Sequence, residues 1–170
     1  RGAKSLCGET QTRMEGTMSL DSSMQEQALK GVRILDFTHV YQGPVCTQLL
    51  ADFGADVIKV ERPGMGDWSR QWGPFVGDVS LPFAGLNRNK RSLALNLKDD
   101  RGLQIMHKLV TQSDVLVHNF RPGAMEKLGL GYDDASRLNP RLVYATSSGW
   151  GDAGPYVDRR RGGHDMVARA

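Results

Sequence analysis

The sequence predicts an α/β fold in which helices cover both faces of a parallel β-sheet. Two observations support this prediction. Short apolar runs typical of buried strands alternate with segments whose apolar residues recur at helical spacing. Gly or Pro stands at several of the boundaries between them. Strands that alternate with helices form parallel sheets whose two faces are both covered.

The first predicted unit is a strand, a helix and a second strand. Residues 32–37 (VRILDF) form a predicted buried strand, and Pro44 suits the first turn of the helix that follows. Apolar residues continue at helical spacing over 45–53, until Gly54 provides a natural stop. Residues 57–60 (VIKV) are the second predicted strand.

A polar stretch rich in Gly and Trp, residues 63–89, then interrupts the alternation. The pattern resumes with a third predicted strand at 92–97. Asp99 or Asp100 is a suitable cap for a helix whose apolar residues repeat over 103–110.

The last predicted elements are shorter. Residues 114–117 form a fourth strand, two helical pieces follow at 123–128 and 133–138, and 142–145 form a fifth strand. A Gly-rich loop at 148–155 comes next.

Residues 1–30 are predicted to be a disordered leader, because they show neither helical nor alternating periodicity. A mitochondrial transit peptide is the alternative: Arg1, Lys4 and Arg13 fit one, whereas the acidic residues of this segment do not. We expect 31–170 to be the folded part.

No run approaches the roughly 20 apolar residues of a membrane span, so we expect a soluble cytoplasmic protein, or a mitochondrial one if the leader is a transit peptide.

Charge and cysteine content argue against two kinds of site, one for nucleic acid and one for a metal held by cysteines. The net charge is only +3 and the basic residues are scattered, which favours a small phosphorylated ligand over nucleic acid. Cys7 and Cys46 lie far apart, without the spacing of a metal site, so both are predicted to be reduced and structural.

Ligands of parallel sheets bind beyond the carboxyl ends of the strands. The residues that follow the predicted strands are therefore candidates: 39–42, 61–62, 98, 119–121 and 147–150. The helix N-terminus after Pro44 suits an anion, but the G-x-G-x-x-G fingerprint is absent, which disfavours an NAD site.

Each candidate also has an ordinary explanation. Arg62 suits a phosphate or an adenine ring, yet it, Lys98 and Lys127 could equally be solvated surface charges. Asn119 could simply cap the next helix. His164 beside Asp165 looks reactive, but adjacent residues on a helix do not face each other, so a structural His164 is favoured at this point.

Several segments, in order, resemble the family III CoA-transferases, which include formyl-CoA transferase, carnitine CoA-transferase and methylacyl-CoA racemase. The segments are 31–40 (GVRILDFTHV), 43–44 (GP), 51–64 (ADFGADVIKVERPG), 87–93 (NRNKRSL), 119–123 (NFRPG), 128–132 (LGLGY) and 163–165 (GHD).

The resemblance implies a Rossmann-like large domain within an interlocked homodimer, with 31–170 as the incomplete N-terminal part of that domain. It implies acyl-CoA and a carboxylic acid as substrates, with no prosthetic group, metal, nucleic acid or membrane as a partner. The implied CoA contacts are His39, Val40, Tyr41, Gln42, Arg62, Leu95, Asn96, Leu97, Lys98, Asn119, Phe120, Arg121 and Lys127.

The family mechanism is covalent: an aspartate attacks the acyl-CoA and becomes an aspartyl-CoA thioester that returns CoA to the acceptor. By resemblance this aspartate lies beyond Ala170, so we expect the 170 residues alone to be inactive.

Two other functions remain open: a racemase that uses His164 as a proton carrier, or a CoA-binding module without catalysis. The long insertion at 70–87 favours the transferase over the racemase. Tyr41 stands where formyl-CoA transferase has glutamine, which argues against formate or oxalate as the substrate acid.

Overall fold

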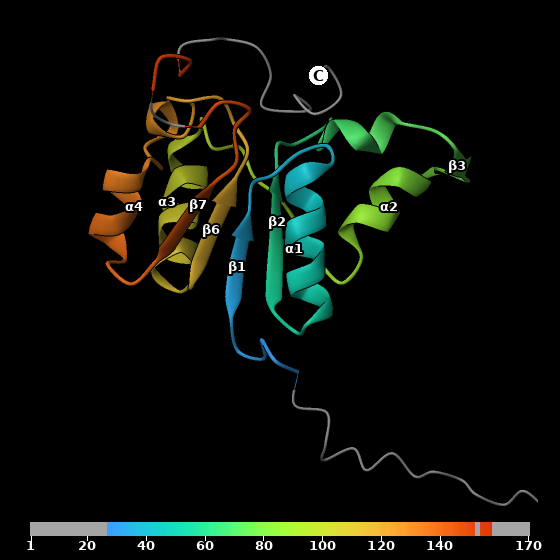
Figure 1. Cartoon of the computed structure of the whole chain (residues 1–170), viewed down its shortest axis with the longest axis horizontal. Helices are drawn as coiled ribbons and strands as arrows, with labels where there is room; N and C mark the ends of the chain where they lie inside the picture. Colours follow the sequence, from blue (N-terminus) through green and yellow to red (C-terminus); the bar gives the residue numbers. More distant parts are fainter. Residues whose placement is uncertain (1–26, 152–153, 158–170) are drawn as a thin grey trace, which may run out of the picture.

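A five-stranded parallel sheet forms the centre of the protein (Figure 1). The structure, a computed structural model, describes residues 27–151 and 154–157. The sheet runs in the spatial order β5-β2-β1-β6-β7 and consists of β1 (Arg33–Asp36), β2 (Asp56–Glu61), β5 (Arg91–Ala94), β6 (Val115–His118) and β7 (Val143–Thr146). The chain winds from β1 through β2 to β5 and then returns to place β6 on the other side of β1. This is Rossmann-like topology, and its winding direction changes between β1 and β6.

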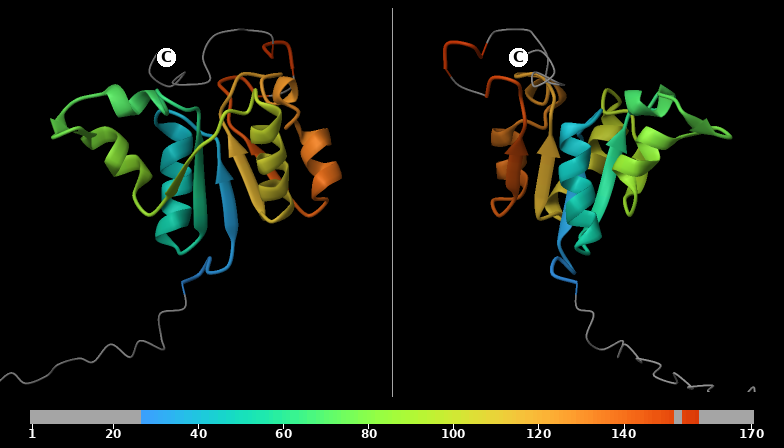
Figure 2. Two further views of the ribbon diagram at one scale, coloured as in Figure 1. Left: turned by 180° about the vertical axis from the view of Figure 1, so that it is seen from behind. Right: turned by 45° about the vertical axis from the view of Figure 1, so that its right-hand side comes forward.

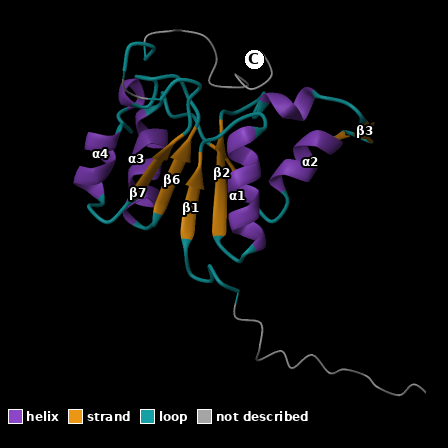
Figure 3. Cartoon of the chain, in the orientation of Figure 1, coloured by secondary structure: helices purple, strands orange, loops and turns teal. Residues whose placement is uncertain are grey.

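Helices cover both faces of this sheet (Figures 2 and 3). Helix α1 (Gln42–Asp52) covers the face that contains Ile34, whereas α3 (Asp100–Thr111) and α4 (Tyr132–Leu138) cover the face that contains Leu35. Neighbouring strand residues belong to different hydrophobic clusters because successive side chains point to opposite faces. The predicted α/β fold and its covered parallel sheet are confirmed.

The N-terminus of α3 is anchored by two sequence features. Asp99 accepts hydrogen bonds from the N–H groups of Arg101 (3.0 Å) and Gly102 (3.4 Å), so it is the cap that the sequence predicts. A Cβ atom at Gly102 would lie 2.0 Å from the carbonyl oxygen of Asn96. Only glycine lets α3 approach the segment that follows β5 this closely.

Residues 63–89 are more structured than the sequence indicates. They contain the 3-10 helix η2 (Trp68–Gln71), the antiparallel strands β3 (Phe75–Val76) and β4 (Val79–Ser80), and the helix α2 (Leu81–Asn87). This unit projects beyond α1 (Figure 1). These elements are too short to produce a periodic signal, and Ser80 helps to hold them together because its hydroxyl donates to the carbonyl oxygens of Ser69 and Trp72.

Smaller differences concern the ends of elements and one cysteine. The predicted helical piece at 123–128 is a turn followed by the 3-10 helix η3 (Glu126–Leu128). Cys46 is a free, exposed cysteine, so the prediction that it is structural is wrong. Cys7, His164 and the leader up to residue 26 lie outside the described residues. In the described part of the chain, no helix has the length and apolarity needed to cross a membrane.

Candidate functional site

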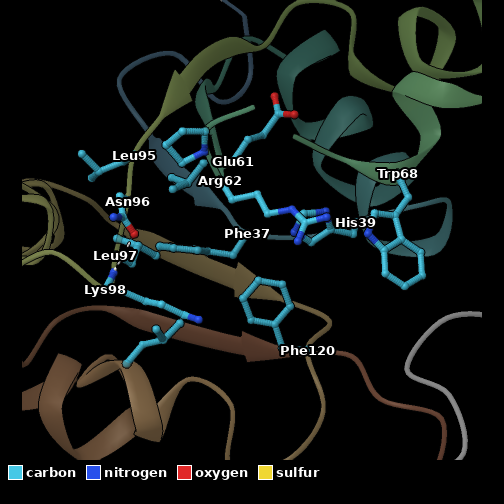
Figure 4. Close-up of a pocket in the computed structure, with 13 residues that line it drawn as sticks. Phe37, His39, Glu61, Arg62, Trp68, Leu95, Asn96, Leu97, Lys98 and Phe120 are labelled. Atoms are coloured by element: carbon cyan, nitrogen blue, oxygen red, sulfur yellow. Dashed lines mark hydrogen bonds between the residues drawn. The ribbon is translucent and has the colours of Figure 1, made fainter. Parts of the chain in front are cut away.

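A cavity of about 620 Å³ lies at the carboxyl edge of the sheet (Figure 4). It is formed where β1, β2, β5 and β6 end, next to the position at which the winding of the chain changes direction. Its lining residues are Phe37, His39, Val60, Glu61, Arg62, Pro63, Trp68, Leu95, Asn96, Leu97, Lys98, Phe120 and Leu128. Most of them are apolar or aromatic, and Arg62 and Lys98 supply positive charge. A cavity of this kind suits an organic ligand that carries anionic groups.

The cavity brings together many of the CoA contacts that the family resemblance implies, and some of these are also strand-end residues. Those that line it are His39, Arg62, Leu95, Asn96, Leu97, Lys98 and Phe120. Lys127 lies in an adjoining hollow of about 380 Å³, which shares Leu97, Lys98 and Leu128 with the cavity.

The other predicted residues do not line the cavity. Val40 is buried, Tyr41 and Gln42 are exposed at the start of α1, and Arg121 is exposed. Asn119 is buried and does not cap a helix; its side chain bonds to the backbone of His39 instead.

The two cations of the lining are accessible to a ligand. Arg62 and Lys98 are both exposed, and within the described residues the Arg62 guanidinium donates a hydrogen bond to the Met65 sulfur. Figure 4 shows the Lys98 side chain extending into the cavity, toward Phe120. A guanidinium offers a planar fork of donors and an ammonium offers a compact charge, and both suit phosphate oxygens.

The carboxylate of Glu61 also belongs to the lining, but its charge is neutralised. Arg70 donates to its two oxygens at 2.7 and 2.6 Å, and the Asp67 N–H donates at 2.8 Å. Burial raises the pKa of Glu61, but the Arg70 hydrogen bonds and charge, with help from Asp67 N–H and Lys59, hold it below its ordinary value. Glu61 therefore remains an ionised, paired group.

A cluster of buried charges lies beneath the site, on the α1 face of the sheet. The Lys59 ammonium is 2.9 Å from the Asp67 carboxylate, and the Lys90 ammonium is 3.0 Å from that of Asp36. Burial raises the pKa of Asp67, but the Lys59 charge and the Ser69 hydrogen bonds outweigh it and lower that pKa to about 2. Isolated charges inside apolar strand runs, Lys59 in 57–60 and Asp36 in 32–37, were the available sequence signal for this cluster.

The backbone that follows β1 is held in an unusual conformation. Val40 has a φ of 74°, a region that β-branched residues rarely adopt and that costs about 1–3 kcal/mol. Its neighbour His39 is clamped by Asn119, whose side-chain oxygen accepts from the His39 N–H and whose amide donates to the His39 carbonyl, both at 2.8 Å. The His39 ring also stacks on Phe120, with 5.3 Å between ring centroids.

No group of three or more metal-ligating His, Cys, Asp or Glu side chains is present in residues 27–151 and 154–157. The site in this part of the chain consists of the cavity, its two exposed cations and the rigid backbone beside His39.

Comparison with known proteins gives one consistent result. A protein-family model, CoA-transferase family III, matches residues 29–170. The chain is 48% identical over 143 residues to succinyl-CoA:glutarate CoA-transferase of Mus musculus, an alignment that covers 84% of this chain and 32% of that protein. It is 50% identical over 133 residues to formyl-CoA:oxalate CoA-transferase of Bradyrhizobium sp. (strain ORS 278), covering 78% of this chain and 31% of the relative.

A solved structure agrees with these sequences. The crystal structure of a CAIB/BAIF family protein from Brucella suis matches with a TM-score of 0.75 and 37% identity, covering 79% of this chain and 37% of that one. The chain spans about a third of the length of the curated relatives it matches.

Proposed function

The chain belongs to CoA-transferase family III, and from this premise we propose that the full-length protein moves CoA from an acyl-CoA to a carboxylic acid. The cavity at the strand ends is the observation that carries the proposal, because it combines apolar walls with two exposed cations. Arg62 and Lys98 would hold the phosphates of CoA, and the apolar wall formed by Phe37, Leu97 and Phe120 would take its less polar parts.

The transfer itself would use an aspartate outside these 170 residues. That carboxylate attacks the acyl carbonyl and expels the CoA thiolate, which leaves a mixed anhydride. The thiolate then attacks the aspartyl carbonyl, which releases the donor acid and forms the aspartyl-CoA thioester. Attack by the acceptor carboxylate and a second attack by the thiolate give the new acyl-CoA and regenerate the aspartate.

In this proposal the 170 residues supply CoA binding and positioning, and alone they transfer no CoA. We propose that residues 1–30 are a leader and that 31–170 begin the large domain of an interlocked homodimer in the cytoplasm, or in mitochondria if the leader is a transit peptide. The alignments, which cover about a third of each relative, support the existence of further domain structure.

CoA titration of the full-length protein by calorimetry tests the binding role. Arg62→Ala should weaken binding by about 1.5–3 kcal/mol, the range for a hydrogen bond to a charged group. Arg141→Ala is the matched control, because Arg141 is exposed and does not line the cavity. Unchanged affinity in Arg62→Ala would remove this residue from the site, and a full-length protein that binds no CoA would refute the proposed function.

The racemase alternative predicts a different role for His164. If the protein is a transferase, His164→Tyr should retain acyl transfer. If it is a racemase, the same change removes a proton carrier and should abolish exchange of the α-proton with deuterated water. A transferase assay that collapses in His164→Tyr would count against the proposal.

A further inference from the structure

The conformation of Val40 depends on a carboxylate that lies outside the cavity. Val40 is buried, and its positive φ persists only if surrounding groups hold it. The Val40 N–H lies 3.2 and 3.3 Å from the two oxygens of Asp67. Asp67 caps η2, the first element of the projecting unit in residues 63–89, so the contact joins two segments that are distant in sequence.

Asp67 is itself held rigidly. Its carboxylate accepts from the Ser69 N–H at 2.9 Å and from the Ser69 hydroxyl at 2.8 Å, and it pairs with the Lys59 ammonium. Lys59 also donates to the carbonyl oxygen of Thr38 at 2.7 Å. The Lys59–Asp67 pair therefore holds the backbone on both sides of His39, at Thr38 and at Val40.

His39 transmits this constraint to the cavity. Its ring lines the cavity and stacks on Phe120, which also lines it, while one ring nitrogen lies 3.8 Å from the Asp67 carboxylate. Asn119 fixes the His39 peptide from the side of β6. The position of a cavity wall is thus determined by side chains that do not line the cavity.

We propose that Asp67 is a positioning residue for the CoA site: together with Lys59 it holds the backbone at Thr38 and the strained Val40, and so sets the place of the His39 ring. This inference rests on the proposed function, since the ligand that the cavity takes is assumed to be CoA. Asp67 itself touches neither the cavity nor, by this inference, the ligand.

The first test combines two substitutions in the full-length protein. Asp67→Asn keeps an oxygen acceptor but removes the charge that pairs with Lys59, and we expect roughly tenfold weaker CoA binding by calorimetry. Val40→Gly removes the steric cost of the positive φ. Adding Val40→Gly to Asp67→Asn should therefore restore CoA affinity to within about threefold of the parent.

A structural control separates positioning from general stability. Asn139→Ala removes hydrogen bonds from the Asn139 amide to the carbonyls of Val110 and Ser113, which do not line the cavity. It should lower the melting temperature and leave CoA affinity unchanged. The inference is overturned if Asp67→Asn binds CoA like the parent, if Val40→Gly restores no affinity, or if Asn139→Ala weakens binding equally.

If Asp67→Asn does not fold, Ser69→Ala is the second variant, because it removes only one of the hydrogen bonds that orient the carboxylate. We expect about threefold weaker CoA binding, reversed by Val40→Gly. Unchanged affinity in Ser69→Ala would overturn the inference.

A readout that needs no CoA distinguishes this inference from the proposed function. The ring signal of His39, in protein labelled with 13C-histidine and assigned by His39→Gln, should shift in Ser69→Ala, which keeps the Asp67 charge beside the ring, and should return when Val40→Gly is added. If the parent protein binds no CoA but this signal behaves as expected, the proposed function fails and the positioning role of Asp67 is supported. If the parent binds CoA and the signal stays unmoved in Ser69→Ala, the positioning role is overturned and the proposed function stands.

Discussion

The Lys59 ammonium lies 2.9 Å from the Asp67 carboxylate, with 2% and 0% of the two side chains exposed. The pair sits on the sheet face covered by α1, where β2 also places the apolar Val57. Removing one member of a buried pair leaves the other charge uncompensated.

Lys59→Met should therefore lower the free energy of unfolding by about 3–5 kcal/mol. Arg91→Met is the control: Arg91 bonds to both oxygens of Asp56, but it is exposed, so this change should cost less than about 1 kcal/mol. Urea denaturation of the two variants measures the difference. Equal losses would contradict the importance of burial for the Lys59–Asp67 pair.

The lowered pKa of Asp67 predicts an acid-dependent loss of stability. This pKa is about 2 in the folded protein, below the ordinary value of 3.8. The ionised carboxylate contributes its full stabilisation, about 2 kcal/mol, above the ordinary pKa, and the contribution is lost as the pH falls toward the folded value. Asp67→Asn should lack this contribution. Unfolding free energies measured between pH 5 and pH 2.5 should converge for parent and variant, and parallel curves would refute the prediction.

Two helical glycines should respond to alanine in opposite ways. Gly102→Ala should destabilise the protein, because the new Cβ would lie 2.0 Å from the Asn96 carbonyl oxygen and would push α3 away from the segment after β5. Gly85→Ala in α2 should raise stability by up to about 1 kcal/mol, since nothing lies within 4 Å of that Cβ and alanine favours helix. Calorimetric melting of both variants tests the pair. Stabilisation by Gly102→Ala would show that α3 leaves room for a Cβ atom beside the Asn96 carbonyl oxygen.

Lys98 should contribute less to CoA binding than Arg62. An ammonium is a strongly hydrated point charge, whereas a guanidinium presents a planar fork to phosphate oxygens. We expect Lys98→Ala to weaken CoA affinity about threefold to tenfold, with the effect reduced at high salt. Lys108→Ala, an exposed lysine in the last turn of α3, should leave affinity unchanged. A loss in Lys98→Ala larger than that in Arg62→Ala would reverse the proposed order.

Local signals in the sequence predicted the positions of the sheet strands and the start of α3. Apolar runs located all five strands of the sheet, and Asp99 marked the start of α3, because a cap acts on N–H groups two and three residues away. Strand ends then pointed to His39, Arg62 and Lys98, since the carboxyl ends of parallel strands meet at one edge. The family could also be recognised from the order of its motifs, and the match over 29–170 confirms it.

The sequence by itself thus determined the order along the chain of the five sheet strands and of α1, α3 and α4, the parallel sheet, and the edge at which the cavity lies. Only the tertiary structure decided which charges are buried together and how residues 63–89 fold. Lys59 and Asp67 are eight positions apart and belong to different elements, and Val40 approaches Asp67 across 27 positions. No local periodicity encodes such contacts, because they form only when β1, β2 and the projecting unit have packed against one another.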